Sequence, residues 1–203
     1  MRGPLGLARA AVCSTARSCL AVIRALFLAA AILSLLAAPQ ALAQTPAANE
    51  FEIEAVFLFN FTQFVVWPST AFADANDPFV ICVLGEDRFG GYLDDTIRGE
   101  TVDQRSMIVK RYRRMEEIDV CHILFISKSE ASSVRDVLVR LRGRSVLSVS
   151  DAENFGRQGG MVRFVVEHNR VRLRINVEAA RAAGLAISSK LLRVADIVRT
   201  GKD

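Results

Sequence analysis

One short run constrains the fold more than any other part of the chain: residues 121–127, Cys-His-Ile-Leu-Phe-Ile-Ser. The run is nearly all apolar and rich in β-branched and aromatic side chains, which is typical of a strand buried on both faces. A second such run, residues 79–84, also carries one cysteine. Ser127 and Glu130 have the spacing of a capping box, so we expect the first strand to pass directly into a helix.

The remaining chain alternates between strand and helix patterns. We expect strands at residues 79–84, 107–109, 121–127, 146–149, 161–167 and 170–176, and helices at 49–64, 87–98, 129–142, 151–156, 177–183 and 191–198. His168 and Asn169 form a turn between the last two strands, which makes those strands an antiparallel hairpin. The pattern predicts a single layered α/β domain, with a mainly parallel sheet flanked by helices and a late antiparallel hairpin.

The predicted helix at 49–64 is apolar on more than one side. It carries five phenylalanines, namely Phe51, Phe57, Phe59, Phe61 and Phe64. A helix that is apolar nearly all round is buried on most sides. Two explanations stay open: the helix lies in the core of its own domain, or one of its faces contacts a second copy of the chain or another partner.

Residues 1–43 have the pattern of a secretory signal peptide. Four arginines precede a largely apolar run at 25–38, and Ala41-Leu42-Ala43 matches an A-x-A cleavage site. The apolar run is short for a membrane-spanning helix, so we expect cleavage rather than a retained anchor. The expected product is one exported domain, residues 44–203, soluble and without a membrane span.

The charge balance changes when the signal peptide is removed. The whole chain has 26 basic and 22 acidic residues, but residues 1–43 hold four of the arginines and no Asp or Glu. The domain at 44–203 therefore has 22 basic and 22 acidic residues and no net charge. Overall charge gives no reason to expect a nucleic-acid partner, and we predict none.

Two cysteines lie outside the signal peptide, Cys82 and Cys121. In an oxidising compartment an even pair favours a disulfide. Closing a ring of about 40 residues would stabilise the fold by about 4 kcal/mol in the chain-entropy model. The alternative is two separate buried cysteines.

No catalytic or metal-binding pattern stands out. The two histidines, His122 and His168, are predicted in a buried strand and in a turn, and the sequence has no G-x-S-x-G elbow. Cys121 and His122 are adjacent on a strand and point to opposite faces, so they do not readily share one ion. The glycine-containing segment at 85–91 matches neither common phosphate-binding pattern. We therefore expect no enzyme activity, no metal and no cofactor.

Several motifs nevertheless occur in a characteristic order. They are AVFLFNF at 55–61 followed by Trp67-Pro68, FVICVLG at 79–85, CHILFIS at 121–127, VSD at 149–151 with Phe155 and Gly159-Gly160, Ile175-Asn176, AAGL at 182–185, and ISSKLL at 187–192. This ordered set covers nearly the whole predicted domain. It resembles the YfiR family, which are periplasmic proteins of Gram-negative bacteria.

The resemblance implies a function that the spacing of residues along the chain does not indicate. YfiR-like proteins bind and repress the periplasmic sensor domain of an inner-membrane diguanylate cyclase of the YfiN type, which lowers cyclic di-GMP and biofilm formation. The resemblance also implies a homodimer and a disulfide between Cys82 and Cys121. The better studied relatives have a second cysteine pair near the C-terminus, and this chain has none there.

Candidate partner contacts come from the most family-like segments. They are Phe155, Asn176, Ser188, Ser189 and Lys190. Simpler roles are open for each of them, because Asn and Ser also cap helices and a phenylalanine also fills a core. The alternative function is a periplasmic small-molecule-binding module that acts on another membrane sensor, such as a histidine kinase.

Overall fold

The computed structural model describes residues 46–201, so the predicted signal peptide and its cleavage site lie outside the described residues. An eight-stranded sheet with the order β10-β8-β7-β6-β5-β2-β4-β3 forms the centre. Its neighbouring strands are parallel except in the β7–β8 hairpin and the short β3–β4 pair. A separate antiparallel pair joins β1 to β9. The predicted α/β fold, with its late hairpin, is confirmed.

The elements have the following bounds. The strands are β1 (Val65–Val66), β2 (Phe79–Leu84), β3 (Thr101–Val102), β4 (Arg105–Tyr112), β5 (Ile123–Ile126), β6 (Leu147–Ser150), β7 (Val162–Glu167), β8 (Arg170–Asn176), β9 (Ala186–Ile187) and β10 (Asp196–Val198). The helices are α2 (Pro46–Phe64), α3 (Gly91–Ile97), α4 (Val134–Arg140), α5 (Val177–Ala182) and α6 (Ser189–Leu192). Within residues 46–201, no helix is long and apolar enough to cross a membrane.

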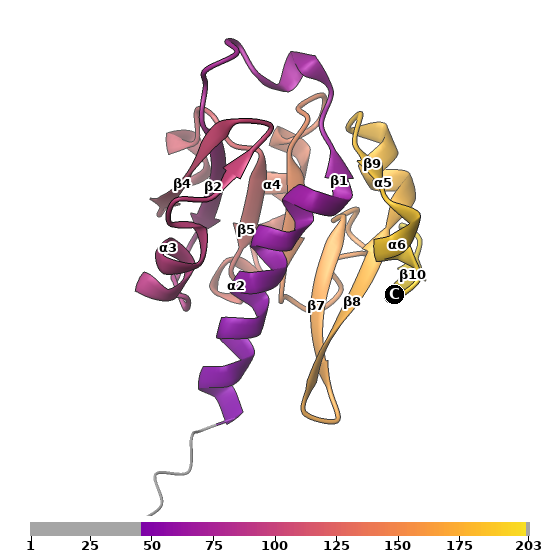
Figure 1. Cartoon of the computed structure of the whole chain (residues 1–203). Coiled ribbons are helices and arrows are strands. Elements are labelled where there is room, and N and C mark those ends of the chain that lie inside the picture. Colours follow the sequence, from indigo (N-terminus) through magenta and orange to yellow (C-terminus); the bar gives the residue numbers. More distant parts are fainter. Residues whose placement is uncertain (1–45, 202–203) are drawn as a thin grey trace, which may run out of the picture. The chain divides into compact units, whose positions relative to one another are not determined.

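Helices cover both faces of the sheet, with α2 across one face and α4 behind the other (Figure 1). Successive side chains of a strand point to opposite faces. In β2, Ile81 and Val83 therefore join the core under α2, whereas Cys82 and Leu84 join a second core under α4. This two-sided burial is the reason that β2 and β5 are unbroken apolar runs in the sequence.

The phenylalanine-rich helix α2 packs into the core of its own domain. Phe61 is fully buried, and its ring stacks on Phe164 of β7 with 6.1 Å between the centroids. The outer side of α2 keeps a narrow apolar strip, where Ile53 and Val56 are 39% and 38% exposed. The core explanation therefore holds for most of the helix, and the predicted contact with a second copy stays a prediction.

The helix predicted at 151–156 is wrong, because those residues form consecutive turns. The capping-box spacing of Ser150 and Glu153 predicts that Ser150 caps this helix. It instead ends the buried strand β6, where its hydroxyl donates to the carbonyl of Ile126 at 2.6 Å and accepts from Ala152 N at 3.0 Å. The Ser150 hydroxyl, which the capping pattern assigned to a helix, thus bonds to the neighbouring strand β5 and to the turn after β6.

Two other helices differ from prediction. The capping box at residues 127–130 leads only into a 3₁₀ turn, because the Glu130 carboxylate accepts from the hydroxyl of Ser133 and α4 starts later, at Val134. The helix predicted at 191–198 is wrong. Ser188 caps α6 instead, accepting from Lys190 N at 3.2 Å, and residues 196–198 form β10 because the edge of β8 is available for pairing.

Gly160→Ala tests the packing of the turn between β6 and β7. A Cβ on Gly160 would lie 2.2 Å from the ring of the buried Phe155, so we expect the free energy of unfolding to fall by about 1–3 kcal/mol. Gly91→Ala is the matched control, because a Cβ there meets nothing within 4 Å. Urea denaturation measures both variants, and equal stabilities would contradict the prediction.

Candidate functional site

The predicted disulfide is present between Cys82 in β2 and Cys121, two residues before β5, with the Cα atoms 6.0 Å apart. Both cysteines are buried, at 0% and 6% exposure. The bond crosses between parallel neighbours in the centre of the sheet. A reductant reaches a buried bond only when the protein opens locally, so this crosslink is placed to stabilise the fold.

Replacing both cysteines by alanine should lower the free energy of unfolding by about 2–4 kcal/mol, because the unfolded chain loses its loop constraint. Urea denaturation of the variant and of the wild-type protein, each with and without reductant, measures this loss. Reductant should destabilise only the wild-type protein. A variant as stable as the oxidised wild-type protein would contradict the prediction.

His122 is a structural residue at the amino end of β5. Its Nδ1 accepts from Val80 N at 3.0 Å, and its Nε2 therefore carries the proton and donates to the carbonyl of Ala71 at 3.2 Å. The ring stacks against Phe72 and Phe79, with centroids 4.4 and 4.8 Å away. Burial lowers the pKa of His122, which favours the neutral imidazole in this role.

Charged side chains gather at the opposite, carboxyl edge of the sheet. In the sheet, β4 lies on one side of β2 and β5 lies on the other, so the direction of strand addition reverses at β2. The α/β sheets of other proteins bind ligands at the carboxyl ends of the strands near such a reversal. Here Arg88 Nη2 lies 2.5 Å from Asp151 Oδ2 and 3.4 Å from Glu54 Oε2. The Arg88 guanidinium also lies over the ring of Phe51, 4.2 Å from its centroid.

Glu54 comes from α2 and is fully buried in this cluster. Burial raises the pKa of its carboxyl to about 8, and the opposing effect of Arg88 is smaller. Its Oε1 has no hydrogen-bond partner within residues 46–201. The cluster therefore ties α2 to the loops after β2 and β6 through a carboxyl group that tends to keep its proton. Across the same residues, no three His, Cys, Asp or Glu side chains are grouped to hold a metal ion.

Glu54 should make the protein less stable as the pH rises from about 5 to 8. In this window the folded state holds a proton at Glu54 that the unfolded state, with a pKa near 4.5, has released. Glu54 then lowers the free energy of unfolding by up to about 1.4 kcal/mol for each unit of pH increase. Glu54→Gln should remove this contribution, as measured by urea denaturation between pH 5 and 9. Glu52→Gln, on the exposed side of α2, is the control, and a slope unchanged by Glu54→Gln would contradict the assignment.

Three of the predicted contact residues have structural roles. Phe155 is fully buried, so the structure gives it no exposed surface for a partner and places it in the core. Asn176 is also fully buried; its Oδ1 caps α5 by accepting from Ala179 N at 3.0 Å, and its Nδ2 donates to Thr200 Oγ1 at 2.9 Å. Ser188 caps α6, as described above. These are the simpler roles that the sequence left open.

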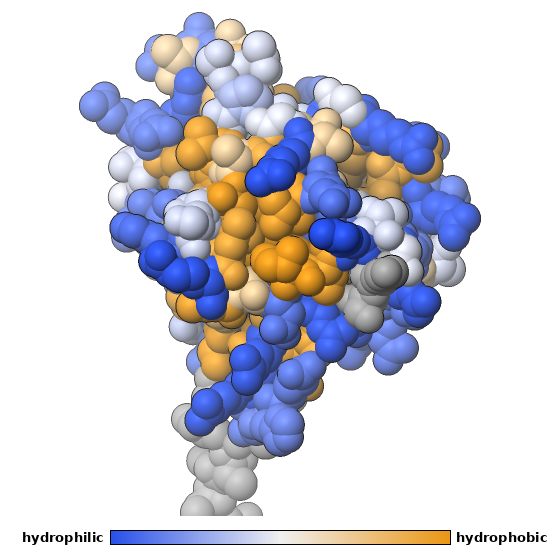
Figure 2. All heavy atoms as spheres, turned by 90° about the vertical axis from the view of Figure 1, so that its right-hand side faces the viewer, coloured by the Kyte–Doolittle hydropathy of each residue, from blue (hydrophilic) through white to orange (hydrophobic). Residues whose placement is uncertain are grey.

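Ser189 and Lys190 are exposed on α6, and the segment that follows exposes two apolar side chains that sequence reasoning missed. Val194 and Ile197 are 67% and 54% exposed. We call these four residues the α6–β10 face. Figure 2 shows that the side of the molecule carrying α5, α6 and β10 has an apolar centre with a polar rim. Exposed apolar areas of this kind mark interaction surfaces. The predicted helix at 191–198 concealed the exposure of Val194 and Ile197, because it assigned the wrong periodicity to this segment.

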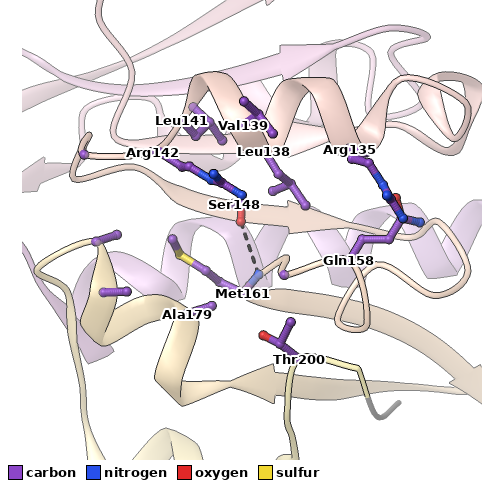
Figure 3. A pocket seen from close by; sticks show the side chains of 14 residues that line it. Arg135, Leu138, Val139, Leu141, Arg142, Ser148, Gln158, Met161, Ala179 and Thr200 are labelled. Atoms are coloured by element: carbon purple, nitrogen blue, oxygen red, sulfur yellow. Dashed lines mark hydrogen bonds between the residues drawn. The ribbon is translucent and has the colours of Figure 1, made fainter.

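A cavity of about 430 Å³ lies between α4 and α5 (Figure 3). Its walls are mostly apolar, with Leu138 and Val139 from α4 and Ala179 and Ala182 from α5. Met161, at the start of β7, also lines it. The sequence carried no signal for this cavity, because its walls come from segments far apart in the chain.

Comparison with known protein families supports the family resemblance that the sequence motifs indicated. A family model described as YfiR/HmsC-like matches residues 51–196. The match covers most of the chain and includes both disulfide cysteines and α6. No curated protein matches the chain.

Proposed function

This chain belongs to the YfiR/HmsC-like family, and we propose that it is a periplasmic repressor of diguanylate cyclase signalling. In this proposal it binds the periplasmic sensor domain of an inner-membrane diguanylate cyclase and holds the cytoplasmic cyclase inactive. Cyclic di-GMP and biofilm formation fall as a result. The family match over residues 51–196 carries the proposal, and the protein acts by binding rather than by catalysis.

The disulfide supports an extracytoplasmic location for this activity. Disulfides persist in oxidising compartments such as the periplasm and are rare in the cytosol. The bond between Cys82 and Cys121 lies in the central pair of strands. A periplasmic repressor needs a fold that stays intact outside the cytoplasm, and this crosslink supplies part of that stability.

The α6–β10 face supports the binding of a partner. Val194 and Ile197 supply apolar area, and Lys190 gives the rim a positive charge. Within residues 46–201, β10 pairs with β8 and with no other strand, which leaves its outer edge available to a partner. We propose that the sensor domain contacts this face. Relief of repression is then a population shift between bound and free repressor.

The cavity between α4 and α5 favours a second candidate function. Its volume falls in the range of small-ligand pockets, about 300–1,000 Å³. This supports the small-molecule-binding module that acts on another membrane sensor, such as a histidine kinase. The two functions are compatible, because a ligand that binds only one state of the repressor changes its affinity for a partner.

A pull-down from membranes with the mature protein tests the proposal, with captured proteins identified by mass spectrometry. We expect a diguanylate cyclase. The Val194→Asp/Ile197→Asp variant should capture at least about tenfold less, since a loss of 1.4 kcal/mol is tenfold in affinity. Val166→Asp is the matched control, because Val166 is 46% exposed and lies on β7, outside the α6–β10 face.

The identity of the captured protein decides between the two functions. A sensor kinase in place of a cyclase would overturn the cyclase assignment in favour of the second candidate. Failure of the wild-type protein to capture any membrane partner would contradict both sensor assignments. Equal capture by the Val194→Asp/Ile197→Asp variant and the wild-type protein would remove the α6–β10 face from the proposal and leave the cyclase assignment intact.

A further inference from the structure

The cavity between α4 and α5, called the groove from here on, combines an apolar interior with cationic side chains at its rim. Arg135 and Arg142 both lie on its α4 side (Figure 3). Arg135 lies within α4, and Arg142 lies two residues after the last residue of α4, Arg140. An apolar groove with positive charge at its rim suits a ligand that has an apolar body and a negatively charged group.

The two arginines carry charge that the described chain leaves unpaired. Both are exposed, and neither guanidinium has an ion pair or hydrogen bond with any residue in 46–201. Two other polar side chains at the cavity are engaged: Ser148 Oγ accepts from Met161 N at 3.2 Å, and Thr200 Oγ1 accepts from Asn176 Nδ2. A ligand would therefore find free donors on the arginines.

Small side chains keep the groove open. Ala179 and Ala182 of α5 and Ala183, directly after α5, line it together with Leu138 and Val139 of α4. Larger residues on α5 would fill the space between the helices and bring their side chains into contact. Instead, part of the apolar surface of α4 stays uncovered, and Val139 is 48% exposed.

We propose that this groove binds a small amphiphilic carboxylate. The apolar body lies between α4 and α5, where it buries the uncovered surface of both helices. The carboxylate accepts charge-assisted hydrogen bonds from Arg142 or Arg135, which are stronger than neutral ones and frequently bidentate. The site goes beyond the proposed repressor function and does not depend on it.

The groove also includes a residue of the segment that follows β10. Thr200 lines the groove and lies two residues after β10, and Gly201 N donates to the carbonyl of Arg157 at 3.2 Å. A ligand that orders Thr200 and its neighbours would act directly on the strand that carries Ile197. The groove is thus placed to couple a small molecule to partner binding.

Octanoate is the probe for this site. We expect saturable amide chemical-shift changes in a ¹H–¹⁵N spectrum of the mature protein, concentrated at groove residues such as Gly143, Gly159 and Ala182. Octan-1-ol has the same apolar body without the charge, and it should bind at least about tenfold more weakly. Absence of saturable binding, shifts centred elsewhere, or equal affinity for the two probes would overturn the proposal.

Two variants separate the contributions of charge and space. Arg135→Glu/Arg142→Glu should weaken octanoate binding at least tenfold, and Ala182→Trp should abolish the binding of both probes by filling the groove. Arg172→Glu and Ala75→Trp are exposed controls away from the groove and should bind octanoate as the wild-type protein does. The spectrum itself reports whether each variant is folded. Folded groove variants with unchanged affinity would overturn the site. None of these measurements involves a partner, so their failure is distinct from failure of the repressor proposal.

Discussion

The parallel pairing of β2 with β5, buried on both faces, is the constraint on which the rest of the structure depends. A strand with apolar side chains on both sides must be covered twice. That requirement places α2 on one face and α4 on the other. It also brings the carboxyl ends of both strands to one edge, where Arg88 and Asp151 meet. The disulfide then links the same pair of strands covalently.

The carboxyl edge shows how the fold accommodates buried charge. Moving ions out of water is costly unless they are paired and hydrogen-bonded. Arg88 pairs with Asp151, and Glu54 next to them is a carboxyl whose pKa is raised. A protonated Glu54 adds no second negative charge to the cluster. The contact between α2 and this edge is therefore expected to depend on pH, whereas the apolar side chains of α2 hold it on the sheet.

The two surfaces proposed to bind a partner and a ligand both include residues near the C-terminal end of the described chain. The α6–β10 face and the groove between α4 and α5 both involve the segment around β10, the first through Ile197 and the second through Thr200. One surface is apolar with a polar rim, as a protein partner requires, and the other is narrow with free arginines, as a small anion requires. Their shared segment gives a simple physical route by which a ligand and a partner affect one another.

The sequence by itself determined the central strands, the hairpin, the pairing of Cys82 with Cys121 and the family, because unbroken apolar runs, turn residues and ordered motifs are local signals. The same local signals failed at Ser150 and at residues 191–198. There, hydrogen bonds to β5 and pairing with β8 outweighed capping and helical periodicity. Only the tertiary structure placed Phe155 in the core, exposed Val194 and Ile197, and assembled the groove from α4, α5 and the start of β7. Such features depend on contacts between distant segments, and no spacing along the chain encodes them.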